Sequence, residues 1–417
     1  MNTKIAITIV AILAVAILIT IGVFWYNNSP NISQKLPGQS QNITMKGVVD
    51  ANNQFAMDLY NNWDSQKGNI FFSPYSISSA LAMTYEGARG ETATEMQNVL
   101  HIPIDQTTRT SEFSQINAQI NDPNKPYLLT IANALWAQEN YPFSQDYLSL
   151  IDKYYDGKAT NLDFISNPEG SRQTINQWVE DKTNDKIQNL IQKGLINSYT
   201  RLVLTNAIYF KANWTLQFDA TLTQNKSFMS DNGNLIIPMM EQIDNFNYAE
   251  SSDMQALELP YQGNDISMLV LLPKDSISSL ESSLTLSKLN KIRNALEMEK
   301  VDVSLPKFKI ETDYSMSKDL SGMGMPTAFS AENADFSGMT GKQDLFISEV
   351  VHKAFINVTE QGTEAAAATA VIMGTSLSPS HYTPPKVFNA DHTFIFVIQQ
   401  KSTGNILFMG RVSNPSE

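Results

Sequence analysis

The chain has 417 residues, 42% hydrophobic and 17% charged, a composition that excludes a disordered or low-complexity protein and predicts a large buried core. Its net charge of −13, without any lysine- or arginine-rich run, argues against a nucleic-acid partner. Cysteine is absent, which excludes disulfides, thiolate metal sites and cysteine nucleophiles.

The first segment is apolar. Ile5–Tyr26 carries no charge, and as a helix it would be roughly 33 Å long, enough to cross the hydrocarbon core of a bilayer. Lys4 before it and Trp25 and Tyr26 after it fit a cytoplasmic amino terminus and an outer interfacial anchor. We therefore predict that residues 1–26 form a single-pass membrane anchor and that the rest of the chain lies outside the cell.

A cleaved signal peptide is the alternative for this segment. It would have a shorter apolar part, about 7 to 15 residues, and only Thr20-Ile21-Gly22 resembles a cleavage site. The protein would then be secreted. Residues 27–46 are rich in Asn, Ser, Gln and Pro without an apolar period, which predicts a flexible stalk before the main domain at 47–417.

Helical patterns come first in the main domain. Apolar residues three and four apart predict a helix over 48–63 and another that begins near Pro74 and ends at Gly87. The stretch RQTINQWVEDKTNDKIQNLI, residues 172–191, is a third helical pattern.

Strand patterns dominate afterwards. Runs of β-branched and aromatic residues predict strands in TRLVLTNAIYF, MQALELPY, ISMLVLLP, KVDVSLPKFKI, FISEVVHKAFINV, HTFIFVIQQ and NILFMGRV. Because helices precede strands without β–α alternation, we predict an α+β fold with largely antiparallel sheets.

No motif for catalysis or metal binding is found in the sequence. The four histidines form no H-E-x-x-H pair, the glycines no phosphate-binding loop and the serines no G-x-S-x-G elbow. We therefore expect no enzyme activity, no metal site and no cofactor. His352 shares a strand face with Val350, Ala354 and Ile356, which favours a hydrogen-bonded core histidine over a catalytic base.

One long segment fits neither helix nor strand throughout. Between Ala365 and Pro385 there is no Asp, Glu, Lys or Arg, and turn formers follow its larger apolar residues. Such a loop in a compact domain indicates either a function or a wrong assignment. Locally, the segment could begin as a short helix with nothing to bury, or as a strand whose alternate residues form one small uncharged face.

Seven blocks of sequence occur in an order that a known family shares. They are NIFFSPYSISSALAMTYEGARGETATEM, TIANALWAQE, LTNAIYFKANW, VSLPKFKIE, VVHKAFINVTEQGTEAAAATA, FNADHTFIFVI and ILFMGRVSNP. These blocks resemble the serpins, a family of serine protease inhibitors, over residues 47–415. The resemblance implies three mostly antiparallel β-sheets, about nine helices, an exposed reactive-centre loop near 360–386, and a monomer.

The resemblance also implies a suicide mechanism. A protease attacks the loop as a substrate and forms an acyl-enzyme, and the cut loop then inserts into the main sheet as a new strand and traps the protease. The small residues of the hinge suit insertion, because they bury no unpaired charge, and Gly362 gives the pivot backbone freedom. We assign the hinge to Glu360, Gly362, Thr363, Ala365, Ala367 and Thr369. A non-inhibitory serpin, acting as a binding or chaperone-like protein, and a hydrolase are the alternatives.

Further positions follow from the residue-by-residue match. Ser73, Ser76, Asn206 and His352 match the family's shutter, a polar cluster beneath the parting strands. Trp214 matches the tryptophan where the hinge enters, called the breach, and Lys307 with Glu360 matches a salt bridge at the base of the loop. The alternative for each is plain core packing or a surface pair worth about 0 to 1 kcal/mol.

The attacked bond is predicted from spacing. Counting 17 residues from Glu360, the family's usual distance, places Ser376 before the bond and Leu377 after it, whereas counting back from Phe388 gives Ser380. We adopt the first count because insertion constrains the length on that side. Without Lys or Arg in the loop, an elastase-, chymotrypsin- or subtilisin-like serine protease is the expected target. A cysteine protease stays open as a target.

Overall fold

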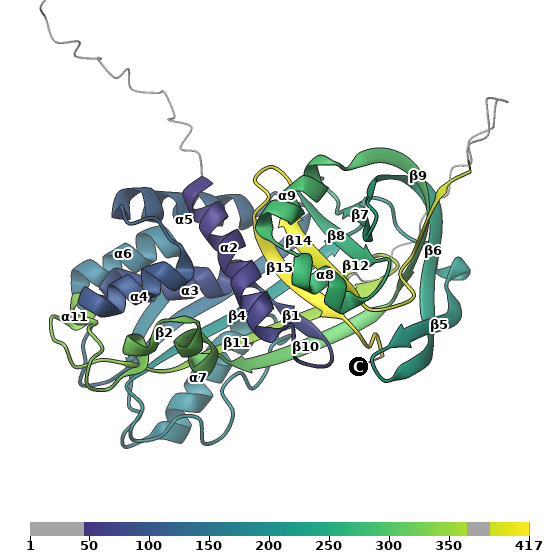
Figure 1. The fold of residues 1–417 in the computed structure, drawn as a ribbon. Coiled ribbons are helices and arrows are strands. Elements are labelled where there is room, and N and C mark those ends of the chain that lie inside the picture. The colour runs from purple at the N-terminus through teal and green to yellow at the C-terminus, as the bar shows by residue number, and fades with distance from the viewer. Residues whose placement is uncertain (1–45, 365–383, 417) are drawn as a thin grey trace, which may run out of the picture. The chain divides into compact units, whose positions relative to one another are not determined.

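The computed structural model describes residues 46–364 and 384–416 (Figure 1). Its helices are α2 (Lys46–Trp63), α3 (Pro74–Gly87), α4 (Gly90–Leu100), α5 (Gln106–Ile120), α6 (Gln145–Tyr155), α7 (Pro168–Lys182), α8 (Ile277–Ser283), α9 (Leu286–Asn294), α10 (Ser317–Met323) and α11 (Ser337–Thr340), with short 3-10 turns at Ala220–Leu222 and Pro326–Phe329. The predicted helix over 48–63 is confirmed as part of α2.

The described strands form two sheets. The six-stranded main sheet has the order β10-β11-β12-β4-β2-β3, built from β10 (Phe308–Ser315), β11 (Ile347–Thr359), β12 (Gly362–Thr363), β4 (Leu202–Asn213), β2 (Tyr127–Gln138) and β3 (Lys158–Leu162). The nine-stranded sheet has the order β1-β15-β14-β8-β7-β6-β9-β13, and β5 pairs with β6 beside this path. Its strands are β1 (Ile70–Phe72), β5 (Gln224–Ser230), β6 (Gly233–Glu250), β7 (Met254–Pro260), β8 (Ile266–Pro273), β9 (Glu297–Pro306), β13 (Lys386–Asn389), β14 (Phe394–Gln400) and β15 (Ile406–Val412).

This architecture confirms the predicted α+β fold with largely antiparallel pairing. Two of the three expected sheets are continuous here, because the 18-residue strand β6 pairs in turn with β5, β9 and β7. β5 pairs with its first part, β9 with the stretch from Met239 to Tyr248, and β7 with its last four residues. Three strand pairs are parallel, namely β11 with β4, β2 with β3, and β13 with β9. The first of these lies in the interior of the main sheet.

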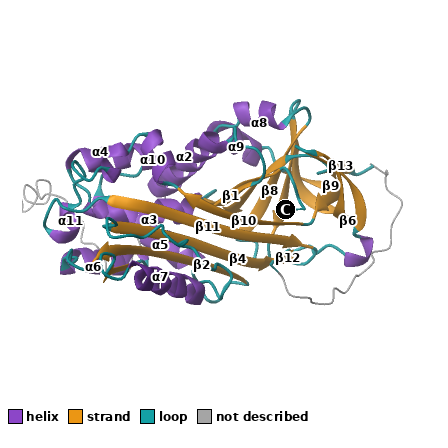
Figure 2. Ribbon diagram, turned by 90° about the horizontal axis from the view of Figure 1, so that it is seen from below, coloured by secondary structure: helices purple, strands orange, loops and turns teal. Residues whose placement is uncertain are grey.

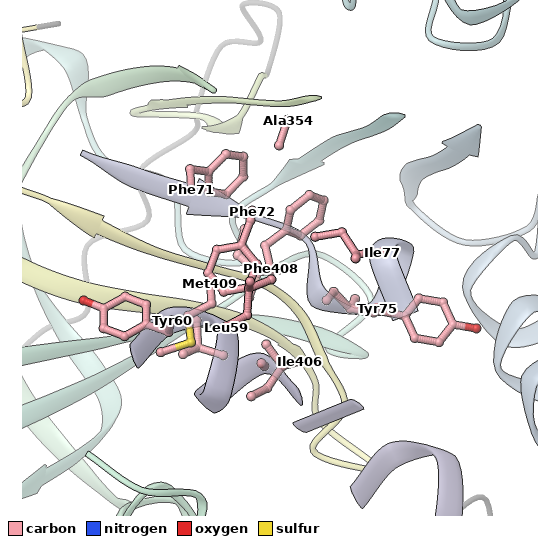
Figure 3. Packing of buried hydrophobic residues seen from close by; sticks show 14 of the residues in the cluster. Leu59, Tyr60, Phe71, Phe72, Tyr75, Ile77, Ala354, Ile406, Phe408 and Met409 are labelled. Atoms are coloured by element: carbon pink, nitrogen blue, oxygen red, sulfur yellow. The ribbon is translucent and has the colours of Figure 1, made fainter. Parts of the chain in front are cut away.

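Apolar side chains pack on both faces of the main sheet. Figure 2 shows the strands of this sheet and the helices around it. On one face, Ile77 and Leu81 of α3 belong to a large core that also takes in Ile208 and Phe210 of β4. Figure 3 shows this core where α2, β1, α3 and β15 meet, with the rings of Phe71 and Phe408 stacked 5.4 Å apart. On the other face, a second cluster joins α7 to β2 and β4.

Helix α3 begins and ends as its sequence predicts. Ser73 is its N-cap, since its side chain accepts a hydrogen bond from the backbone N–H of Ser76, and Pro74 occupies the first turn. The helix ends at Gly87. This cap fixes Ser73 and Ser76 directly under the main sheet, a placement that matters for the functional site.

The third helical pattern is only half helical, which corrects the prediction for 172–191. Helix α7 ends at Lys182, and Asn184 and Asp185 adopt left-handed backbone angles, with φ of 52° and 58°. Asn and Asp tolerate this conformation better than other side chains, and the N–H of Asp185 closes the helix on the carbonyl of Glu180 at 2.9 Å. Residues 183–200 instead run across the main sheet, and we call them the crossing segment.

None of the helices within 46–364 and 384–416 has the length and hydropathy needed to span a membrane. The predicted anchor at 1–26 and the stalk at 27–46 lie outside the described residues, apart from the start of α2 at Lys46.

Candidate functional site

A row of polar side chains crosses the main sheet. The strand register sets Asn133 of β2 beside Asn206 of β4, and Asn206 beside His352 of β11. The first turn of α3 meets this row with Ser73 and Ser76. All five residues are buried, with at most 3% of any one exposed. The structure therefore brings together the four residues that the sequence singled out, and it adds Asn133.

Continuous hydrogen bonds join this polar cluster. The backbone N–H of Ser73 donates to Nε2 of His352 at 3.2 Å, so the ring proton sits on Nδ1, which bonds to Oδ1 of Asn206. The Asn206 amide donates to Ser76 Oγ and to Oδ1 of Asn133. Ser73 Oγ donates to the carbonyl of Leu407 at 2.6 Å. The cluster thus links α3, β2, β4 and β11, and its Asn206–His352 bond bridges the parallel strand pair.

His352 is held neutral. Burial lowers its pKa to about 3, far below the ordinary value, while the contact with Asn206 opposes the shift. Its Nε2 accepts from a backbone N–H and not from a serine hydroxyl, so His352 and the two serines are not arranged as base and nucleophile. Within 46–364 and 384–416, no three His, Asp or Glu side chains are grouped to hold a metal ion.

Two of the predicted hinge residues lie in the main sheet. β12, which consists of Gly362 and Thr363, lies between β11 and β4 and is antiparallel to both. Thr363 pairs with Val358 on one side and Ala212 on the other. Below this point β11 and β4 pair directly, as far as Phe355 and Tyr209. β4 and β11 are therefore separated at one end of the main sheet, where β12 lies between them.

Gly362 is required at this place by space and by backbone angle. Its φ is +152°, and a Cβ added there would lie 2.1 Å from the carbonyl oxygen of Ala212. Thr363 is fully buried and its hydroxyl is 2.7 Å from that of Tyr261, so its side chain points into the larger core. The predicted pivot thus has a steric cause.

Trp214 lies beside the hinge, as the match suggested. Its indole N–H donates to the carbonyl of Thr359 at 3.0 Å, and its backbone N–H donates to that of Gln361 at 2.8 Å. Its ring stacks on Tyr261 with centroids 4.4 Å apart. Tyr261 therefore contacts both Trp214 and Thr363, and it packs against β12 from the core side.

Lys307 and Glu360 form the expected ion pair, with a shortest N–O distance of 2.9 Å. The Glu360 carboxylate is nearly buried and also accepts from the Thr223 hydroxyl at 2.9 Å. Burial alone would raise the pKa of Glu360, but the bonds from Lys307, its own backbone N–H and Thr223 outweigh burial and hold the pKa below its usual range. The pair fixes the end of β11 before the hinge.

The remaining predicted positions lie outside the described residues. These are the hinge residues Ala365, Ala367 and Thr369 and the bond between Ser376 and Leu377. Sequence reasoning missed Asn133 and Tyr261. Asn133 could have been found as the one amide in the otherwise apolar strand pattern TIANALW, whereas nothing local marks Tyr261 as the partner of the hinge.

The neutral state of His352 predicts an acid-sensitive fold. Its folded pKa near 3 lies below the unfolded value of about 6.5, so between these values the unfolded chain binds the extra proton and stability falls as pH falls. From pH 7 to pH 5 the loss is about 2 kcal/mol. We expect the urea midpoint of the wild type to fall accordingly and that of His352→Gln to fall less. Equal pH dependence in the wild type and in the His352→Gln protein would rule out a neutral buried imidazole.

Comparisons with known proteins agree with this geometry. Residues 50–415 match the family model described as serpin (serine protease inhibitor). An uncharacterised serpin-like protein of Thermococcus kodakarensis is 46% identical over 374 residues, which cover 89% of this chain and 87% of the relative. The leukocyte elastase inhibitor of Equus caballus is 41% identical over 385 residues, covering 89% of this chain and all of the relative.

A solved structure shares the fold. Serpin48 of the insect Tenebrio molitor superposes with a TM-score of 0.80 at 34% identity, over 90% of this chain and 100% of its own. Serpin48 is described as a highly specific serpin. The family match, the relatives and the strand order agree, and the chain belongs to the serpins, a family of protease inhibitors rather than enzymes.

Proposed function

We propose that this serpin inhibits a serine protease as a suicide substrate. The main observation in support is that β12 lies between the parallel strands β4 and β11 and pairs antiparallel with both. A strand that continues from β12 would replace one parallel ladder by two antiparallel ladders. Antiparallel pairing is slightly more stable per residue, so the sheet gains from accepting the loop.

The gain is large enough to drive a mechanical step. Each inserted residue adds backbone hydrogen bonds worth about 0.5 to 1.5 kcal/mol net, so a dozen residues contribute on the order of 10 kcal/mol. The uncut chain cannot insert freely, because its loop is tied at both ends, to β12 and to β13. The native fold would then be a kinetic trap, released when the loop is cut.

The register of β12 supports a position for each inserted hinge residue. Continuing the pairing of Thr363 with Ala212 and Val358 by two residues at a time sets Ala365 between Phe210 and Ile356. The same count sets Ala367 between Ile208 and Ala354, and Thr369 between Asn206 and His352. All three follow Thr363 on the core face, where large side chains already fill the space, so small residues are needed.

Thr369 would therefore reach the polar cluster. Insertion has to break the Asn206–His352 hydrogen bond, which would leave two buried polar groups without partners at a cost of about 1 to 3 kcal/mol each. A hydroxyl can both donate and accept, so Thr369 could bond to both residues in place of the broken contact. This supports the assignment of Thr369 as the deepest of the hinge residues.

The reaction needs no catalytic group from the serpin. The serine hydroxyl of the protease attacks the carbonyl carbon of Ser376, the Ser376–Leu377 peptide bond breaks, and the new amino group of Leu377 leaves. The protease remains as an ester on Ser376 while the freed hinge inserts. Deacylation by water would return active protease, so insertion has to be faster.

The target is proposed from the loop. The absence of Lys and Arg disfavours a trypsin-like pocket, and Ser376 and Leu377 suit elastase-, chymotrypsin- or subtilisin-like pockets. One relative is named a leukocyte elastase inhibitor, which agrees with this class. A non-inhibitory serpin is the second candidate, although the small hinge side chains favour an inhibitor.

Mixing the detergent-solubilised chain with subtilisin-, elastase- and chymotrypsin-type proteases tests the proposal. We expect a complex with the summed mass that survives denaturing gel electrophoresis, because the ester link is covalent. Loop cleavage without any such complex across the panel would favour the non-inhibitory candidate.

A substitution in the hinge isolates the insertion step. Ala365→Arg should turn the inhibitor into a substrate, because the inserted charge would face the core between Phe210 and Ile356 without a partner, at a cost of several kcal/mol. Ser402→Arg, in an exposed turn after β14, is the matched control and should inhibit as the wild type does. If Ala365→Arg still trapped protease at the wild-type ratio, strand insertion would not be the mechanism.

We further propose that Ile5–Tyr26 anchors the protein in the cell membrane with the serpin domain outside, on the strength of its uncharged length. The protein should then resist extraction from membranes by alkaline carbonate, and its intact mass in detergent should include this segment. A mature mass that starts after residue 20 would instead support a cleaved signal peptide and a secreted inhibitor.

A further inference from the structure

The crossing segment, residues 183–200, covers the strands that insertion would separate. Ile187, Leu190 and Ile191 are buried against Val203 and Ala207 of β4 and against Val351 of β11. Lys353 of β11 donates to the carbonyl of Gln188 at 3.0 Å, and Gln192 donates to Asp313 of β10 at 3.0 Å. The segment therefore contacts the sheet on both sides of the β4–β11 boundary.

Glu364 connects the hinge to this segment. β12 ends at Thr363, and the next residue, Glu364, adopts a left-handed conformation with φ of 50°. Its backbone N–H still donates to the carbonyl of Asn357 at 2.7 Å. Its side chain points to the face opposite Thr363, where Nζ of Lys186 lies 2.5 Å from Oε1. The Glu364 side chain is only 12% exposed, and that of Lys186 is 44% exposed.

Tyr209 of β4 lies at the same carboxylate. Burial raises the pKa of its hydroxyl, and a hydrogen bond to Glu364 and the negative charge of Glu364 raise it further. Tyr209 is also the last residue of β4 that pairs directly with β11, opposite Phe355. The contacts of Glu364 thus lie where β4 and β11, separated by β12 at the end of the sheet, begin to pair directly.

We propose that Lys186 is a positioning residue that holds the hinge at its two-residue stage of insertion. Further entry requires Glu364 to leave the left-handed conformation and become a strand residue, which shifts its carboxylate relative to Lys186. The crossing segment must also yield for β4 and β11 to separate. The Lys186–Glu364 pair couples the change in Glu364 to the displacement of the crossing segment. While the loop is uncut, β12 therefore remains between β4 and β11 and does not grow longer. The consequence for inhibition rests on the proposed function, whereas the restraint on β12 does not.

Hydrogen–deuterium exchange of the full chain in detergent, without protease, tests this restraint. The peptides to follow cover 209–216 and 357–364, whose amides include Trp214 and Glu364, donors in the hinge hydrogen bonds. We expect Lys186→Gln and Glu364→Gln each to speed their exchange about two- to fivefold, the range for a partly exposed ion pair. The double variant should exchange no faster than either single variant, since one contact is lost in all three.

Two controls separate positioning from general destabilisation. Lys186→Arg keeps the charge and should restore wild-type exchange. Lys182→Gln changes an exposed lysine, four residues earlier in the chain, that forms no ion pair within the described residues. This variant should leave exchange unchanged, and peptides from α2 should exchange alike in every variant. Unchanged hinge exchange in Lys186→Gln, or effects that multiply in the double variant, would overturn the proposal. The exchange experiment contains no protease, so its result does not depend on inhibition. If the variants exchange faster but the wild type traps no protease in the gel experiment, the restraint on β12 is supported and the proposed inhibition is rejected.

Discussion

The parallel pairing of β4 with β11 determines how the main sheet can accept another strand. Two parallel strands can accept an antiparallel strand between them only if they separate, and β12 already lies between the ends of β4 and β11. Two other features of the molecule lie on this boundary. The polar cluster bridges it on the core side, and the crossing segment covers it on the other face.

The polar cluster is suited to a boundary that opens. Apolar packing at this place would hold the strands together through many small contacts, and an inserted side chain could not replace each of them. Hydrogen bonds between neutral groups can instead be replaced by bonds to the hydroxyl of an inserted residue. The neutrality of His352 matters here, because an imidazolium would have to be moved through a core without a counter-charge. A buried neutral ring avoids that cost, at the expense of stability in acid.

Much of the fold could be predicted from local patterns in the sequence. The cap and the proline of α3, the apolar period of α2 and the strand face of His352 all depend on neighbouring residues, and the structure agrees with them. The match to family blocks then gave Ser73, Ser76 and Asn206 their place beside His352. Asn133 and Tyr261 escaped because their roles come from pairings between strands that are far apart in the chain.

Two features could not be read from the sequence for a different reason. The end of α7 depends on two consecutive left-handed residues, Asn184 and Asp185, inside a pattern that still looks amphipathic. The depth to which the hinge enters the sheet is a balance between strand pairing, which favours entry, and the fixed ends of the loop. Such a balance is a property of the whole fold, and no residue pattern encodes it.

The proposed mechanism requires the uncut fold to store free energy that loop insertion releases. The most direct measurement compares thermal unfolding of the intact chain with that of the chain cut once in the loop by a protease that it does not trap. If the cut loop fills the space between β4 and β11, the gain of about 10 kcal/mol should raise the unfolding midpoint by at least about 10 °C. A cut chain that unfolds at the same temperature as the intact one, or below it, would contradict the account.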